Sequence, residues 1–160
     1  MAIKRPARQV VEQDTQGGGK PARSSFADAF DAVKPGGGWP DGKYEAYVVN
    51  LELDGEIAPP GQPQGKLKAK ITYEGAEDES EAVAGKEMSQ QYSLSDDNGE
   101  MMAGCGFLKR DMETLGYKDF TLNDLEEMFG EIVQQRPRVK IGVRYKDGFT
   151  NAFLNGVVQG

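Results

Sequence analysis

Two short stretches of the sequence place a positively charged side chain at nearly every second position. Residues 66–70 read Lys-Leu-Lys-Ala-Lys, and residues 136–146 read Arg-Pro-Arg-Val-Lys-Ile-Gly-Val-Arg-Tyr-Lys. Because side chains in a strand alternate between its two faces, each stretch predicts a strand with cations on one face and apolar groups on the other. Successive cations would lie about 6.6 to 6.8 Å apart, which suits a repeating anion such as a nucleic-acid backbone.

We expect both rows of cations to contact phosphates. The lysine row is Lys66, Lys68 and Lys70, and the candidates in the arginine row are Arg138, Lys140, Arg144 and Lys146. Either row alone is explained as simply by the solvated outer face of a sheet. Two rows of one sign in an acidic chain favour an anionic ligand, because a solvated face normally mixes signs.

Aromatic side chains near these rows are candidates for stacking on bases, as in proteins that bind single strands. Trp39 precedes the first predicted strand, Tyr92 lies in the third, and Phe149 follows the last turn. For each of them, packing in the core is the alternative. Tyr73 and Tyr145 are in register with the apolar face of their strands, so we predict that they are core residues.

Composition limits the classes of function that remain. The 160 residues are 38% hydrophobic with a formal net charge of −7, which predicts one core, and the acids concentrate in residues 74–131. One cysteine and no histidine argue against a disulfide, a zinc knuckle and a histidine base. The acidic residues 77–81 lack the spacing of a calcium loop, and Cys105 lacks a histidine partner, so we expect neither an enzyme nor a cofactor.

The sequence also predicts where the protein is found. It contains no apolar stretch long enough to cross a membrane as a helix, and its first residues lack the apolar segment of a signal peptide. We therefore expect a soluble protein of a reducing compartment, with no membrane partner. The expected location is the cytoplasm, or the host cell cytoplasm if a phage encodes the chain.

The chain divides by composition near Trp39. Residues 1–25 are basic and rich in glycine, which predicts a flexible arm, and residues 26–33 place Phe26, Phe30 and Val33 at helical spacing. The glycines of residues 36–38 then interrupt the chain. We assign residues 1–38 to a loosely docked basic arm and residues 39–160 to the folded domain.

Strand and helix signals follow in a definite order. Strands are predicted at 44–54, 66–73, 86–94, 136–146 and 149–158, with a long loop at 55–65 and a tight turn at 146–148. Residues 44–54 are apolar on both faces, which fits a strand buried on both sides or bent across a barrel. One helix should bury Met101, Cys105, Leu108, Met112 and Leu115 and end at Gly116. A second should begin at a Thr121–Asp124 capping box and bury Leu122, Leu125, Phe129 and Ile132.

Three strands, a helical connection and a final hairpin predict a mainly β protein with a helical insertion. That order (β-β-β-α-α-β-β) matches the five-stranded oligonucleotide- and oligosaccharide-binding barrel, the OB-fold. An open α+β sheet would give the same order. In the barrel, the first strand would separate the two rows of cations, which makes the lysine row the better candidate for the ligand path.

Four segments, taken in order, resemble a family of bacteriophage and prophage proteins of unassigned function. They are Trp39-Pro40-Asp41-Gly42-Lys43-Tyr44, Lys66-Leu67-Lys68-Ala69-Lys70-Ile71, the strand from Gly85-Lys86 to Tyr92-Ser93-Leu94, and the helix from Phe107 to Gly116. Members of that family are thought to bind single-stranded DNA with an OB-like barrel. The resemblance covers residues 39–158 and implies an accessory protein of DNA replication or recombination, beside a phage recombinase, annealing protein or helicase.

The sequence thus predicts a single-stranded-DNA-binding protein with little sequence preference. Bacterial proteins of that kind typically end in an acidic tail, whereas this sequence ends in Val157-Val158-Gln159-Gly160, so we do not expect recruitment of partners through such a tail. A protein-interaction or virion structural module on the same barrel is one alternative, and RNA binding is another. The oligomeric state is left open, and a homo-oligomer is compatible with the sequence.

Overall fold

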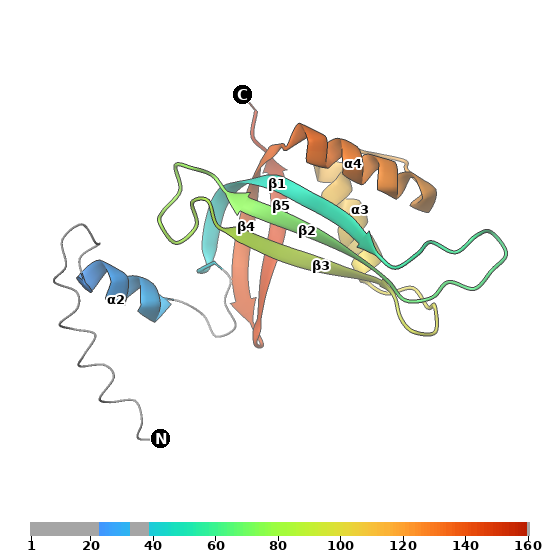
Figure 1. Ribbon diagram of the computed structural model, residues 1–160, viewed down its shortest axis with the longest axis horizontal. Coiled ribbons are helices and arrows are strands. Elements are labelled where there is room, and N and C mark those ends of the chain that lie inside the picture. Colours follow the sequence, from blue (N-terminus) through green and yellow to red (C-terminus); the bar gives the residue numbers. More distant parts are fainter. Residues whose placement is uncertain (1–22, 33–38, 160) are drawn as a thin grey trace, which may run out of the picture.

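Five strands form one antiparallel sheet in the computed structural model, which describes residues 23–32 and 39–159 (Figure 1). The strands are β1 (Gly42–Asp54), β2 (Leu67–Gly75), β3 (Glu87–Ser95), β4 (Arg138–Lys146) and β5 (Phe149–Val157). The helices are α2 (Arg23–Ala32), α3 (Gly104–Thr114), the short 3₁₀ helix η1 (Leu122–Asp124) and α4 (Leu125–Gln135). The prediction of a mainly β protein with helices between the third and fourth strands is confirmed. Most of the predicted arm, residues 1–22 and 33–38, lies outside the described residues.

The order of the strands is β3-β2-β1-β4-β5, which leaves β3 and β5 as the two edges. Within the described residues, no backbone ladder joins these edges. One side chain links them instead, because the Ala152 N–H donates a hydrogen bond to Gln90 Oε1 at 2.9 Å. Helix α3 packs against both edge strands, and α4 packs against β1 (Figure 1). Helix α3 therefore lies where the two edges approach each other, and α4 lies against the central strand.

A β-bulge explains why β1 is apolar on both faces. Its pairing with β2 shifts register between Val48 and Asn50. Before the bulge Ala46 and Val48 are buried, and after it Leu51 is buried, so the inward face changes from even to odd residue numbers. The predicted inward row of β2 is confirmed, because Leu67, Ala69, Ile71 and Tyr73 are all buried.

Helix α3 begins in close contact with β3. A Cβ atom on Gly104 would lie 2.2 Å from the Ser93 carbonyl oxygen, so only glycine fits at this approach. Helix α3 ends as predicted, with Gly116 in the left-handed region at φ +104°. Met101 precedes the helix and is exposed, so its predicted burial is wrong.

The Thr121–Asp124 capping box is confirmed. The Thr121 N–H donates to Asp124 Oδ2 at 2.8 Å, and α4 then buries Leu125, Phe129 and Ile132 as predicted, together with Met128. The predicted burial of Leu122 is wrong, because a 3₁₀ turn precedes the α-helix and leaves Leu122 exposed. Within the described residues, no helix is long and apolar enough to cross a membrane.

Candidate nucleic-acid interface

Two members of the lysine row, Lys68 and Lys70, lie on the outer face of β2 beside acidic side chains of β1, and Lys66 directly precedes the strand. In the register between these strands, Lys68 is opposite Asp54 and Lys70 is opposite Glu52. The Lys70 Nζ lies 3.8 Å from Glu52 Oε2, and Lys66 Nζ lies 3.8 Å from Asp97 Oδ1. Exposed pairs of this kind contribute about 0 to 1 kcal/mol each. Neighbouring acids nevertheless offset much of the positive potential that the lysine row would offer to a phosphate.

Arg138 is held by three acidic side chains. Its Nε lies 2.7 Å from Glu45 Oε1, its Nη1 lies 3.0 Å from Glu77 Oε2, and its Nη2 lies 2.9 Å from Asp78 Oδ1. The bond to Glu45 is the main cause that raises the pKa of the Arg138 guanidinium. All three nitrogens already have carboxylate partners, so the prediction that Arg138 contacts phosphate does not hold for this arrangement. Its bonds instead fasten the β2–β3 loop to β4 and β1.

The Tyr47 ring contacts two arginines, Arg136 directly after α4 and Arg138 at the first position of β4. The Arg136 guanidinium lies 4.3 Å from the centre of the Tyr47 ring, and that of Arg138 lies 5.6 Å away. The Tyr47 hydroxyl donates to Glu77 Oε1 at 2.8 Å and is the main cause that lowers the pKa of this carboxyl. Arg136 also pairs with Glu74 at 3.2 Å. The first part of the arginine row is therefore balanced by acids.

Two of the three predicted stacking residues are buried. Trp39 packs edge-on against Tyr44, with ring centres 5.5 Å apart. Tyr92 faces the core, where its hydroxyl donates to Asp111 Oδ2. Burial raises the pKa of both Tyr92 and Asp111. Neither ring has a free face for a base, so these two predictions are corrected, whereas Tyr73 lies in the core as predicted.

Exposed aromatic rings and cations occur together on the outer face of β4 and β5, which we call the β4–β5 face. Phe149 is 71% exposed and lies opposite Lys146, and Phe153 is 42% exposed and lies opposite Gly142. Arg144 lies between these two pairs, opposite Asn151. The hairpin turn that aligns the strands is as predicted, with Asp147 at φ 54° and Gly148 at φ 85°, the backbone of a type I′ turn.

Gly142 forms the floor of a groove on the β4–β5 face. It is opposite Lys43 of β1 on one side and Phe153 on the other. The groove has a volume of about 630 Å³, and its lining includes Lys43, Arg144, Phe153 and Asn155. A glycine inside a strand often marks a place where a ligand approaches the backbone closely. Here it leaves open space beside Phe153, Lys43 and Arg144, with the amide tip of Asn155 next to it.

The structure thus divides the predicted site. It brings Phe149, Lys146 and Arg144 together on the β4–β5 face, and Lys140 follows on the same side of β4, opposite Glu45. It separates them from the lysine row, because β1 lies between β2 and β4. Sequence reasoning missed Phe153 and Lys43. Phe153 lies four residues after Phe149 in an alternating strand, so the shared face could have been predicted; the position of Lys43 depends on the β1–β4 pairing.

A scan against protein-family models finds no match for this chain, and a search of curated proteins finds none. Within residues 23–32 and 39–159, no group of three or more acidic or cysteine side chains is arranged to hold a metal ion.

Proposed function

We propose that this protein binds single-stranded DNA with little sequence preference and acts in phage DNA replication or recombination, without catalysis. The observation that carries the proposal is the β4–β5 face, where Phe149 and Phe153 are exposed among Lys43, Arg144 and Lys146. Stacking on an aromatic ring is worth about 1 to 3 kcal/mol per base and tolerates any base, because every base has a π face. Bases must be unpaired to stack in this way, which favours a single strand.

We also propose that the fold is an OB-like barrel. The strand order β3-β2-β1-β4-β5 is the order expected when such a barrel is cut between its third and fifth strands. The hydrogen bond from the Ala152 N–H to Gln90 Oε1 supports the approach of those two strands. In this barrel the DNA would cross the last hairpin, with its phosphates beside Lys140, Arg144 and Lys146.

The test is a titration of fluorescently labelled DNA and RNA oligonucleotides at several salt concentrations. If about four phosphates are neutralised, the logarithm of affinity falls with the logarithm of salt with a slope near −3. The double variant Phe149→Ala, Phe153→Ala should weaken binding by about tenfold or more, because two stacking surfaces are lost. Phe107→Ala is the matched control, since Phe107 is also exposed but lies on α3.

Absence of binding at low salt, or an affinity that does not change with salt, would rule out this function. If the matched RNA binds as tightly as the DNA or more tightly, the result would favour an RNA-binding protein. Loss of affinity in Phe107→Ala as large as in the double variant would argue against the β4–β5 face as the binding site.

A further inference from the structure

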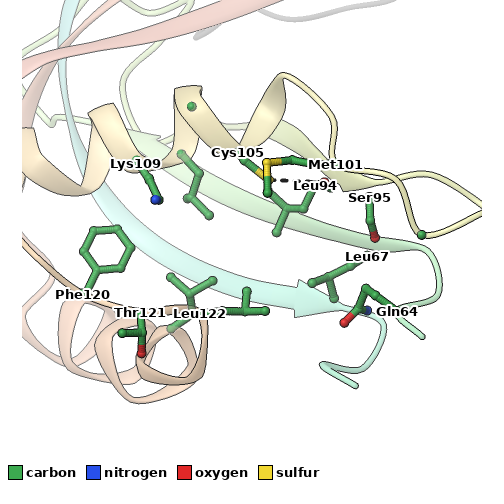
Figure 2. A pocket seen from close by; sticks show the side chains of 14 residues that line it. Gln64, Leu67, Leu94, Ser95, Met101, Cys105, Lys109, Phe120, Thr121 and Leu122 are labelled. Carbon is green, nitrogen blue, oxygen red and sulfur yellow. Dashed lines mark hydrogen bonds between the residues drawn. The ribbon is translucent and has the colours of Figure 1, made fainter. Parts of the chain in front are cut away.

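An apolar groove opens between α3, η1 and the neighbouring ends of β2 and β3. It has a volume of about 550 Å³, and the side chains that line it include Leu67, Leu94, Cys105, Leu108, Phe120 and Leu125 (Figure 2). Met101 and Leu122 stand at its rim, and Met101 is 82% exposed. A soluble chain that leaves large apolar side chains exposed around an apolar groove is expected to cover them with a partner.

Helix α2 carries an apolar pair of matching size. Phe26 and Phe30 lie one helical turn apart, are 63% and 67% exposed, and have ring centres separated by 6.5 Å. An isolated helix of ten residues is marginally stable in water. Amphipathic helices with such a pair commonly bind by laying it into an apolar groove.

The charges around the two surfaces are complementary. Asp31 is exposed on α2 and lies at the side of the Phe26–Phe30 pair, about 100° round the helix from Phe30. Lys109 of α3 is exposed and lines the groove. A carboxylate beside the apolar pair can therefore meet a cation at the groove, which favours this helix over a basic one.

The chain that joins α2 to the sheet limits how far α2 can reach on its own molecule. Seven peptide units separate Ala32 from Trp39, and they span at most about 25 Å. The groove lies beside Leu67, next to the pairing of Asp54 with Lys68. Asp54 ends β1, at the far end of that strand from Gly42 (Figure 1). Strand β1 has 13 residues, which corresponds to about 40 Å. The distance of about 9 Å from Ala32 back to Phe26 along α2 extends the reach to about 34 Å. The reach remains shorter than β1, which favours a helix from another molecule.

We propose that α2 of one molecule docks in the apolar groove of a second copy of this chain. Phe26 and Phe30 enter the groove, and Asp31, at the side of this apolar pair, faces Lys109. Because each copy uses its helix on one side and its groove on the other, the contact is head-to-tail. Such a contact builds open chains or rings rather than symmetric dimers.

Sedimentation velocity of the full chain without DNA tests this contact, over protein concentrations that extend into the millimolar range. The wild type should form species larger than a dimer as the concentration rises. The helix variant Phe26→Ala, Phe30→Ala and the groove variant Met101→Glu, Leu122→Glu should each remain monomeric. All four side chains are exposed, so these changes should leave the fold intact. Gln134→Glu, Gln135→Glu, which adds the same two charges at exposed positions of α4, and Phe107→Ala should associate like the wild type.

Mixing the two deficient variants gives the most specific outcome. The helix variant retains an intact groove and the groove variant retains an intact helix, so the mixture should form heterodimers and nothing larger. A wild type that stays monomeric at every concentration would overturn the proposal, as would a mixture that does not pair. Association that survives in both variants would place the contact on another surface. Because no DNA is present, these outcomes are independent of the test of DNA binding.

Discussion

At the scale of single residues, a substitution of Tyr92 distinguishes a role in the core from a role in DNA binding. Its hydroxyl donates to the buried carboxylate of Asp111. The other oxygen of this carboxylate lies 3.8 Å from Arg110 Nε and accepts no hydrogen bond from the residues that the structure describes. Tyr92→Phe should therefore lower the free energy of unfolding by about 1 to 3 kcal/mol, because a buried charged acceptor loses its donor. Urea denaturation measures this loss. The affinity for DNA, measured in parallel on the folded variant, should be unchanged; a large loss of affinity would return Tyr92 to the binding site.

Gly142 permits a complementary experiment on the β4–β5 face. A Cβ atom there would meet only the tip of the Asn155 side chain, at 3.2 Å, and the backbone needs no left-handed conformation. Gly142→Val should thus keep the melting temperature within a few degrees of the wild type, since valine suits a strand. It should lower DNA affinity about tenfold by filling the floor of the groove, if one stacked base is lost. Unchanged affinity would show that no base lies over Gly142.

At the scale of secondary-structure elements, Arg138 fastens the β2–β3 loop to the sheet. Arg138→Gln removes the charge that Glu45, Glu77 and Asp78 share. We expect a lower melting temperature and faster proteolysis of the loop, while DNA affinity falls less than in the variant Lys140→Gln, Arg144→Gln, Lys146→Gln. Thermal denaturation, limited proteolysis and the oligonucleotide titration distinguish these effects. A loss of affinity in Arg138→Gln equal to that of the triple variant would contradict this structural role.

The elements themselves could be predicted from local patterns. Alternation of apolar and polar residues predicted the strands. The capping box predicted the start of the second helix, and Gly116 predicted the end of the first. The β1 bulge could not be predicted, because it changes which residues face inward without a local sequence signal. The acids opposite Lys68 and Lys70 were also missed, since cross-strand neighbours depend on register, and register depends on the whole sheet. For the same reason, the sequence could not show that Arg138 pairs with three carboxylates whereas Arg144 lies opposite Asn151.

At the scale of the whole molecule, the two proposals together predict cooperative binding. If α2 links neighbouring copies along a strand, wild-type protein should bind long single-stranded DNA with a steep isotherm. Phe26→Ala, Phe30→Ala should bind the same DNA with a shallow one and bind a one-site oligonucleotide with wild-type affinity. Fluorescence titrations with DNA of both lengths measure the difference. If the two proteins have equally steep binding isotherms, the head-to-tail contact does not contribute to DNA binding.

The side chain of Gln90 has a consequence for how the sheet moves. Within the described residues, the edges β3 and β5 are joined by the hydrogen bond that the Ala152 N–H donates to Gln90 Oε1 rather than by a continuous ladder, so separating them breaks few main-chain bonds. Opening at this seam should occur well below the free energy of global unfolding. Hydrogen–deuterium exchange should be faster at the edge-facing amides of β5 than at the amides shared by β1 and β2. If the β3 and β5 edges separate, the β4–β5 hairpin can move outward and single-stranded DNA can enter from the side. A free end of the DNA is then not needed for binding.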